Sequence, residues 1–329
     1  MARIFVTRKI PGSALSKLTS SGHEVLVSEF DRPITSEEFL EKAKGADALL
    51  TLLTDKIDGG VLDAIGPQLK IVSNYAVGFD NINMEDATKR GVLVTNTPSE
   101  VINESVSEFA WTLMLALAKR VVEADESTRR GAYKGWEPGT FLGVNMIGRT
   151  LGIIGLGRIG GMTARRAKGW NMRVLYYNRS RDEQVEKELG VEYTDIDKLY
   201  AESDFISVHL PLTNETRHMI NEGAFNKMKK GIFIVNTARG PIIDEGDLVN
   251  AIREGKVGGA GLDVFDNEPN INPELIGMEN VILTPHIASA TLEAREEYGR
   301  LAVDAILDAL SGKKPQNLVN EEIWLARKH

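Results

Sequence analysis

The sequence contains no cysteine, which excludes disulfide bonds, thiolate zinc sites, iron–sulfur clusters and a cysteine nucleophile. This absence also fits a reducing compartment. Long apolar runs are missing too: the longest, at 109–118, is too short to cross a bilayer and indicates a buried helix. The first ten residues lack the continuous apolar stretch of a signal peptide. We therefore expect a cytoplasmic protein without membrane segments.

An excess of positive charge is also absent. The 39 lysines and arginines are outnumbered by 47 aspartates and glutamates, which gives a net charge of −8. Nucleic acids and anionic membranes bind electropositive surfaces, so neither is an expected partner. The five histidines show no metal-ligand spacing such as HExxH, and we expect no metal site.

Short strand-like runs alternate with amphipathic helical segments along nearly all of the 329 residues. A chain of this length is typical of two domains. The alternation predicts parallel strands joined by right-handed crossovers. In the first hundred residues we expect strands at 3–7, 24–28, 47–53, 70–74 and 92–95, and helices near 11–21, 36–44, 58–65 and 83–90.

A long helix is expected at 101–130, followed by an irregular stretch at 130–143 that exposes Trp136. The alternation then restarts with six strands, which is the number in a complete double mononucleotide-binding sheet. These strands are expected at 151–155, 172–178, 204–208, 231–236, 258–263 and 281–284, with helices near 158–169, 182–189, 222–228, 245–254 and 289–311.

The restart predicts an α/β fold of two Rossmann-like or flavodoxin-like parallel-sheet domains, with an active-site cleft between them. Residues 101–286 form the expected dinucleotide-binding Rossmann domain, and residues 1–100 belong to the substrate-binding domain. The C-terminal segment either stays with the second sheet or crosses back to the first. The long helices at both junctions favour the return, so we assign 287–329 to the substrate-binding domain.

A glycine-rich turn, LGIIGLGRIG at 151–160, lies between an expected strand and an expected helix. This setting is the one that the dinucleotide-binding pattern G-x-G-x-x-G requires. Gly155 allows the tight turn, Gly157 lets the backbone approach a pyrophosphate, and Gly160 lets helix and strand pack closely. The helix N-terminus offers free amides to the phosphates. A purely structural glycine turn is the alternative.

The end of the next strand, YYNRSRDEQ, indicates which dinucleotide binds. Folds that prefer NAD usually carry an acidic residue there for the ribose 2′-hydroxyl, whereas this chain has Asn178. Arg179, Ser180 and Arg181 follow, and charge-assisted bonds from such groups suit a 2′-phosphate. We therefore expect NADP(H) to be preferred, with NAD(H) possible. A solvated basic surface loop is the alternative.

Polar side chains follow three successive expected strands, where a Rossmann-like sheet binds its ligand. They are Arg239, Glu268 and His286. Together they suit reduction of a 2-oxo acid: the guanidinium forks onto the carboxylate, and the imidazole protonates the ketone oxygen. Glu268 fixes the histidine tautomer and favours its protonated form. The alternatives are an ion-pair arginine, a loop carboxylate and a core histidine; His209 is held as a packing or cofactor-lining residue.

Six stretches together resemble the D-isomer-specific 2-hydroxyacid dehydrogenases over almost the whole chain, and look most like the glyoxylate and hydroxypyruvate reductases. The stretches are NYAVGFDNIN (74–83), LGIIGLGRIG (151–160), HLPLTNETRHMIN (209–221), MKKGIFIVNTARGPIIDEGDL (228–248), GLDVFDNEP (261–269) and NVILTPHIASAT (280–291). The resemblance implies a substrate lobe built from both chain ends, a central cofactor lobe, and a homodimer.

The resemblance also implies roles for individual residues. Arg239, Glu268 and His286 become the catalytic residues, and Arg239 also binds substrate. The other implied substrate contacts are Leu52 and Leu53 in the pocket wall, Val77 and Gly78 as amide donors, Ser289, and Trp136 reaching from a neighbouring subunit. For Ser289 a helix cap, and for Trp136 an ordinary loop position, are the alternatives.

The implied cofactor contacts lie on the same strand ends as the catalytic residues. Besides the three glycines and the run Asn178–Arg181, they are Leu156, Arg158, Ile159, Thr237, Ala238, Arg239, Asp263, His286 and Ala288.

The resulting hypothesis is an NAD(P)H-dependent reductase that converts a small 2-oxo acid, glyoxylate or hydroxypyruvate, to glycolate or D-glycerate. Hydride transfer to C2 accompanies proton donation by His286. A D-lactate or other D-2-hydroxyacid dehydrogenase is the alternative within the class. From a different class, the resemblance leaves open a corepressor-like dinucleotide sensor that acts by binding protein partners.

Overall fold

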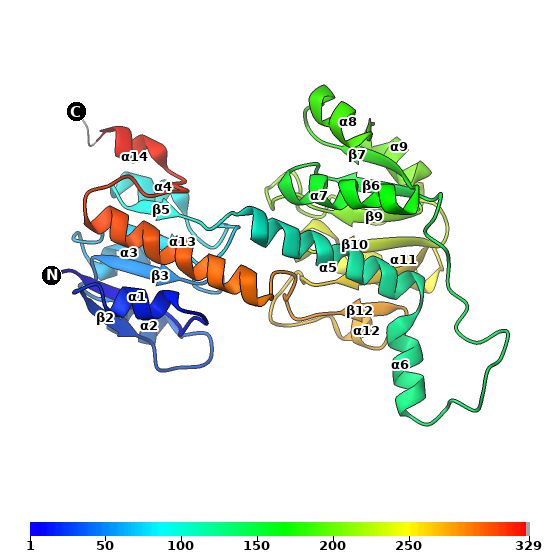
Figure 1. The fold of residues 1–329 in the computed structure, drawn as a ribbon, viewed down its shortest axis with the longest axis horizontal. Helices are drawn as coiled ribbons and strands as arrows, with labels where there is room; N and C mark the ends of the chain where they lie inside the picture. The colour runs from blue at the N-terminus through cyan, green and yellow to red at the C-terminus, as the bar shows by residue number, and fades with distance from the viewer. Residues whose placement is uncertain (327–329) are drawn as a thin grey trace. The chain divides into compact units, whose positions relative to one another are not determined.

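A computed structural model describes residues 1–326. The chain forms two compact units (Figure 1): Met1–Ile102 together with the chain from Ala290 onward, and Asn103–Ser289. Each unit contains one parallel β-sheet, which confirms the predicted fold class. Within residues 1–326, no helix combines the length and the apolar character needed to span a membrane.

The first unit has a five-stranded parallel sheet in the order β2-β1-β3-β4-β5. Its strands are short runs whose buried side chains form cores on both faces of the sheet. The strands are β1 (Arg3–Val6), β2 (Glu24–Val27), β3 (Ala48–Thr51), β4 (Ile71–Asn74) and β5 (Leu93–Thr95), and the helices are α1 (Ala14–Thr19), α2 (Ser36–Ala43), α3 (Gly59–Ile65), α4 (Met84–Lys89), α13 (Leu292–Leu310) and α14 (Glu321–Ala326).

Helix α13 returns the C-terminal part of the chain to the first unit, where it packs on β3, β4 and α1 (Figure 1). Its buried face includes Tyr298 and Ala302, which belong to the same core as Ile71. The rings of Tyr75 and Tyr298 lie 5.0 Å apart. Thr291 caps the helix by accepting a bond from the Ala294 N–H, so α13 begins later than the predicted residue 289.

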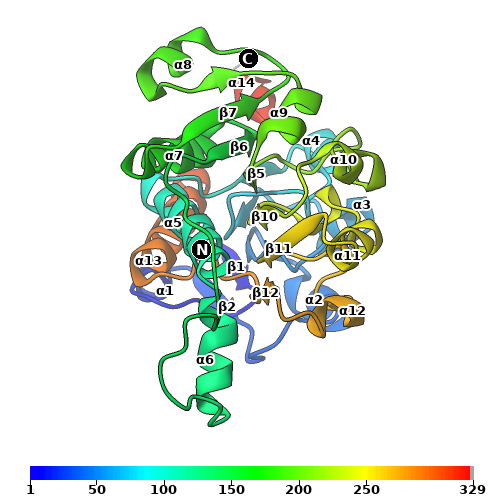
Figure 2. The ribbon, with the colours of Figure 1, turned by 90° about the vertical axis from the view of Figure 1, so that its right-hand side faces the viewer.

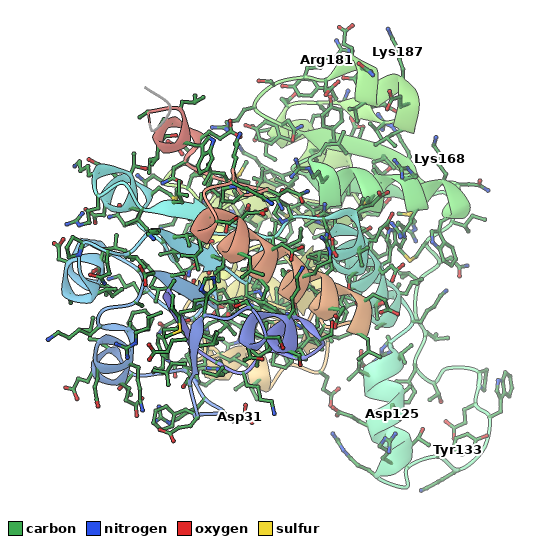
Figure 3. All side chains as sticks on the ribbon, turned by 60° about the vertical axis from the view of Figure 1, so that its left-hand side comes forward. Asp31, Asp125, Tyr133, Lys168, Arg181 and Lys187 are labelled. Carbon is green, nitrogen blue, oxygen red and sulfur yellow. The ribbon has the colours of Figure 1, made fainter. Side chains whose placement is uncertain are left out.

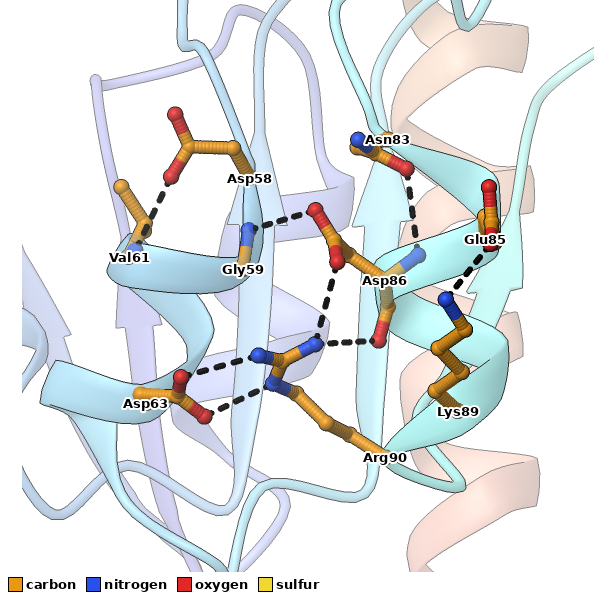
Figure 4. Close-up of polar contacts among 9 residues, drawn as sticks. All are labelled: Asp58, Gly59, Val61, Asp63, Asn83, Glu85, Asp86, Lys89 and Arg90. Carbon is orange, nitrogen blue, oxygen red and sulfur yellow. Dashed lines mark hydrogen bonds and ion pairs between the residues drawn. The ribbon is translucent and has the colours of Figure 1, made fainter.

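A polar clasp joins α3 to α4 in the first unit (Figure 4). Arg90 donates to both oxygens of Asp63, at 2.7 and 2.8 Å, and to the backbone carbonyl of Asp86 at 3.0 Å. Asp86 in turn accepts a bond from the Gly59 N–H, the first amide of α3. This clasp fixes α3, which follows the loop after β3, against α4, which follows the loop after β4.

The second unit has a seven-stranded parallel sheet in the order β12-β11-β10-β9-β6-β7-β8. Its strands are β6 (Thr150–Ile154), β7 (Arg173–Tyr177), β8 (Glu192–Tyr193), β9 (Phe205–Val208), β10 (Ile232–Asn236), β11 (Val257–Leu262) and β12 (Val281–Leu283). The helical segments are α5 (Glu100–Ala118), which starts at the unit border, α6 (Val121–Arg129), α7 (Arg158–Ala167), η1 (Lys168–Trp170), α8 (Glu183–Leu189), α9 (Ile196–Glu202), α10 (Glu222–Lys227), η2 (Gly240–Ile242), α11 (Glu245–Arg253) and α12 (Pro273–Ile276).

The strand order of the second unit has its topological switch point between β6 and β9, which is where doubly wound sheets bind their ligands. The six predicted strands are all present. The seventh, β8, was not predicted because it has only two residues, Glu192 and Tyr193, and both are exposed. Helices α9 and α12 were also missed.

The prediction of one helix over 101–130 is wrong, because the chain breaks between α5 and α6. Arg120 adopts a left-handed backbone conformation with φ 52°. Its guanidinium donates to Glu123 and lies over the Phe141 ring, which holds the bend. Helix α6 has no buried side chain, and with the following loop it extends away from the sheet of the second unit (Figure 2).

Candidate active site

The glycine-rich turn after β6 has backbone contacts that leave no room for a side chain at two of its three glycines. Gly155 has φ +99°, and a Cβ atom there would lie 2.8 Å from the His209 carbonyl oxygen. A Cβ at Gly160 would lie 2.1 Å from the Gly155 carbonyl oxygen. At Gly157, by contrast, a Cβ would meet no atom within 4 Å. The turn is therefore tightly packed at Gly155 and Gly160 and open at Gly157.

Two groups at the carboxyl edge of the second sheet fit a dinucleotide. Helix α7 begins at Arg158, and its N-cap residue, Gly157, supplies no side-chain bond to the first-turn amides. At the end of β10, the Thr237 hydroxyl is buried and has no hydrogen-bond partner in the part of the chain that the structure describes. Uncapped amides and an orphaned hydroxyl at the carboxyl edge of the sheet suit a bound pyrophosphate.

In the loop after β7, some polar side chains are bound to other residues and some are free to contact a ligand. The Asn178 side chain accepts a bond from the Leu156 N–H at 2.7 Å, so it holds the glycine turn. Arg181 donates to both oxygens of Glu186, at 2.8 and 2.9 Å, beside α8 (Figure 3). This bond raises the pKa of Arg181. Arg179 and Ser180 are exposed and form no hydrogen bond with any other residue among 1–326.

The structure brings His286 and Glu268 together. The His286 Nδ1 atom lies 2.9 Å from Glu268 Oε2, and Glu268 Oε1 accepts a bond from the Phe265 N–H. Burial acts to raise the pKa of Glu268, but the bond from His286, the Phe265 amide and the nearby Arg239 charge together hold it below its ordinary value. A carboxylate acceptor keeps a proton on Nδ1, so Nε2 is the nitrogen left to exchange a proton.

Asp263 holds the loop that carries His286. Its buried carboxylate accepts bonds from the Thr284 hydroxyl at 2.6 Å, the Ile287 N–H at 2.8 Å and the Ala288 N–H at 2.7 Å. His286, which these contacts flank, has a left-handed backbone with φ 55°. Burial raises the pKa of Asp263 in spite of these bonds. The cofactor contact that the resemblance implies for Asp263 stays a prediction.

Close packing of Gly240, the residue after Arg239, determines where Arg239 lies. A Cβ atom at Gly240 would lie 1.9 Å from the Phe265 carbonyl carbon, so only glycine lets this segment approach the loop that leads to Glu268. The Arg239 carbonyl accepts a bond from Asn236, and its guanidinium donates to the Ala238 carbonyl. Arg239, Glu268 and His286 thus follow β10, β11 and β12, and the Arg239 charge reaches Glu268.

The proposed substrate contacts of the first unit follow β3 and β4. Leu52 and Leu53 come directly after β3, and the Leu53 side chain is exposed. Val77 and Gly78 lie in the loop after β4, and within residues 1–326 their N–H groups donate no hydrogen bond. Two free backbone amides are the donors that a carboxylate needs.

Ser289 and Trp136 belong to the second unit, and the structure does not bring Trp136 to the other predicted residues. Trp136 is 83% exposed in the loop after α6, where Tyr133 also projects outward (Figure 3). Neither a hydrogen bond nor a ring contact joins Trp136 to any residue that the structure describes. Ser289 is half-buried at the unit border.

His209 lies in a different environment from His286. Its Nε2 atom lies 2.8 Å from the Ser207 hydroxyl, and burial lowers its pKa to about 3, so the ring stays neutral. No group of three or more potential metal ligands occurs among residues 1–326. Sequence reasoning missed the holding role of Asp263 and the packing role of Gly240, although both lie in stretches that it had singled out.

Comparison with known proteins identifies the class. Residues 111–288 match the model of the D-isomer specific 2-hydroxyacid dehydrogenase, NAD binding domain. The chain therefore belongs to the D-isomer specific 2-hydroxyacid dehydrogenase family.

Particular relatives narrow this class. A glyoxylate reductase of Thermococcus kodakarensis is 47% identical over 99% of this chain and 98% of its own. One of Korarchaeum cryptofilum is 48% identical over the same shares of both chains. An NADPH-dependent glyoxylate/hydroxypyruvate reductase from Sinorhizobium meliloti, solved in complex with NADP and malonate, is similar in structure. It has a TM-score of 0.85 and 31% identity, with 97% of each chain covered.

Gly240→Ala should misplace Arg239, because the added methyl group collides with the Phe265 backbone. Arg239 is a predicted catalytic residue, and a shift of about 1 Å at such a group costs on the order of 100-fold in rate, so we expect a kcat loss of that size. Steady-state kinetics of the purified variant measures it. Gly169→Ala is the control, since its Cβ meets nothing within 4 Å. Wild-type turnover in Gly240→Ala would contradict the packing argument.

Proposed function

We propose that this protein is an NADPH-preferring reductase of a small 2-oxo acid, with glyoxylate and hydroxypyruvate as substrates and glycolate and D-glycerate as products. The observation that carries the proposal is the His286–Glu268 pair beside Arg239 at three successive strand ends. The glyoxylate reductases that are 47% and 48% identical to the chain support this choice of substrate.

The proposed residue roles follow from charge and hydrogen bonding. The Arg239 guanidinium binds the substrate carboxylate and polarises the ketone oxygen. A bound nicotinamide dinucleotide supplies the hydride to C2. His286 gives its Nε2 proton to the ketone oxygen, which completes the hydroxyl group, and takes the proton back in oxidation. Glu268 stabilises the imidazolium and holds its ring.

The residues proposed to hold the dinucleotide are those at the carboxyl edge of the second sheet. The amides from Gly157 to Ile159 bind the pyrophosphate, as the open space at Gly157 favours, while the Leu156 N–H stays bound to Asn178. For the 2′-phosphate, the structure supports Arg179 and Ser180 more than Arg181, because Glu186 already neutralises Arg181. The Sinorhizobium meliloti structure holds NADP, which supports the same preference here.

A homodimer is part of the proposal. Within residues 1–326, α6 and its loop form an arm without a buried core, and they expose Val121, Tyr133, Trp136 and Leu142. Exposed apolar side chains concentrated on one arm favour burial against another chain. We propose that a second copy of this chain covers the arm and that Trp136 reaches that copy's substrate site. A cytoplasmic location stays a prediction.

Two other functions differ in what they predict for turnover. A D-lactate or other D-2-hydroxyacid dehydrogenase would use the same catalytic residues and prefer a larger 2-oxo acid. A corepressor-like sensor would bind the dinucleotide and show negligible turnover. An assay of NADPH and NADH oxidation with glyoxylate, hydroxypyruvate and pyruvate separates the three.

His286→Ala should lower kcat for glyoxylate reduction by about 10²- to 10⁴-fold while NADPH binding survives, because general acid catalysis is lost. Glu268→Gln should lower kcat for glyoxylate reduction, because the neutral carboxamide no longer supplies the negative charge that faces a protonated imidazole. Because the pKa of Glu268 is lowered, its carboxylate stays ionised until the pH falls below the ordinary pKa of a glutamate side chain. Stopped-flow and steady-state pH profiles test both variants, and an unchanged Glu268→Gln profile would refute the pairing.

Arg179→Ala should raise the KM for NADPH about tenfold or more and leave the KM for NADH unchanged, since one charged bond to the 2′-phosphate disappears. Arg181→Ala is the matched comparison and should have a smaller effect, because this guanidinium is bound to Glu186. Initial-rate kinetics with both cofactors measures the difference. Equal effects of Arg179→Ala on the two cofactors would argue against a 2′-phosphate site.

Trp136→Ala should raise the substrate KM only if the arm reaches another subunit, and we expect that it does. Trp170→Ala provides the control, because Trp170 stacks on Trp111 outside the arm. Sedimentation equilibrium of the wild type should show a dimer. Unchanged substrate constants in Trp136→Ala would identify an ordinary loop position.

A further inference from the structure

A network of hydrogen bonds between polar side chains connects the loops that follow β3 and β4 in the first unit. Its members are Thr7, Asp55, Asn74 and Asn81. The proposed pocket residues Leu52 and Leu53 and the proposed amide donors Val77 and Gly78 lie on these loops. The network bonds the backbone of Leu52 and the carbonyl of Gly78, and it leaves the N–H groups of Val77 and Gly78 uncontacted. The network therefore determines the geometry of the loops without occupying their proposed binding groups.

Asn81 is the member that contacts both loops. Its Nδ2 atom donates to the Leu52 carbonyl at 3.2 Å and to the Asp55 carbonyl at 2.9 Å. Its Oδ1 atom accepts from Asn74 Nδ2 at 3.1 Å. Its own carbonyl accepts from the Ile57 N–H at 2.9 Å. The Asn81 carboxamide thus bonds through both its nitrogen and its oxygen. It fixes the loop after β3 against the loop after β4.

Asp55 connects the loop after β3 to the end of β1. Asp55 is 6% exposed, and its carboxylate accepts bonds from the Thr7 hydroxyl and from the Leu52 N–H at 2.8 Å. Thr7 follows β1, so this contact spans the switch point between β1 and β3 of the sheet order. That point is where open α/β sheets place their ligands.

The loop after β4 is held through its carbonyl groups. Asn74 donates to the Gly78 carbonyl at 2.9 Å, and Asn96 donates to the Val77 carbonyl at 2.7 Å. The Val77 carbonyl shares its peptide group with the Gly78 N–H, and the Ala76 carbonyl, which accepts a bond from the Thr97 N–H at 3.0 Å, shares its group with the Val77 N–H. These two bonded carbonyls fix the peptide groups that carry the Val77 and Gly78 N–H donors. Asn74 is also the residue that bonds Asn81, so the two loops share one chain of hydrogen bonds.

We propose that Asn81 is a positioning residue for substrate, because its carboxamide aligns the pocket wall at Leu52 and Leu53 with the amide donors at Val77 and Gly78. This inference rests on the proposed function, which places the 2-oxo acid carboxylate at these amides. Asn81 acts on substrate only through the loops. Loss of its Nδ2 donors therefore weakens substrate binding and leaves the dinucleotide site of the second unit unchanged.

The chain offers a matched control in Asn320. This buried residue of the first unit also donates from Nδ2 to a backbone carbonyl, that of Val92, at 2.9 Å, and accepts from the Val94 N–H at 2.9 Å. It holds β5 and touches neither loop. Asn81→Asp and Asn320→Asp remove the same donors and add the same charge, so a difference between them reports position rather than general stability.

The test combines steady-state kinetics with hydrogen exchange on the full-length protein. For Asn81→Asp we expect the glyoxylate KM to rise about tenfold or more, the NADPH KM to stay constant, and exchange to accelerate in 52–56 and 76–80. Asn81→Ser, which adds no charge, should shift both readouts in the same direction and keeps the test open if the aspartate variant fails to fold. Asn320→Asp should lower the melting temperature and keep the glyoxylate KM within about twofold.

Each remaining outcome decides one question. A wild type that fails to reduce glyoxylate would overturn the proposed function and, with it, a role in substrate binding for Asn81. An active wild type with an unchanged KM in Asn81→Asp and Asn81→Ser would overturn the positioning role alone. An equal KM increase in Asn320→Asp would show that general destabilisation explains the effect.

Discussion

The constraint on which this structure depends is that parallel strands end at the same edge of a sheet. Each βαβ crossover brings the chain back in the same direction, so every loop that follows a strand lies at one edge. In the second unit this edge collects the glycine turn after β6 and the three polar residues after β10, β11 and β12. In the first unit it collects the loops after β1, β3 and β4. The direction of the strands is therefore enough to bring residues that are far apart in the chain to the same edge.

Loops at such an edge are not held by strand pairing, and in each unit a polar side chain holds them instead: the buried Asp263 in one and the half-buried Asn81 in the other. Asp263 accepts bonds from two amide N–H groups and so fixes the loop of His286 in a left-handed conformation. In the first unit, Asn81 donates to two carbonyls and so fixes the loop after β3. A buried carboxylate suits amide N–H groups and a carboxamide suits carbonyls, because unpaired buried polar groups are costly.

Much of the fold could be predicted because its signals are local. Strands such as Ile232–Asn236 are short apolar runs between turn residues, and the glycine turn needs only its own sequence and its place between strand and helix. The two-residue strand at Glu192–Tyr193 and the break at Arg120 carry no such signal. Their formation depends on pairing with β7 and on contacts with Glu123 and Phe141. The proposed roles of Arg239, Glu268 and His286 came from their positions at strand ends and from family resemblance, and they remain proposals.

The sequence alone determined the alternation of strands and helices, the dinucleotide turn, and the candidate acid, carboxylate and guanidinium, since these depend on residue type and local spacing. Only the tertiary structure decided which groups are available. It showed that Glu186 holds Arg181, that Asp263 holds the histidine loop, and that Gly240 must remain small beside Phe265. The physical reason is that availability depends on what packs or bonds against a group in three dimensions, and those partners come from segments that local sequence does not connect.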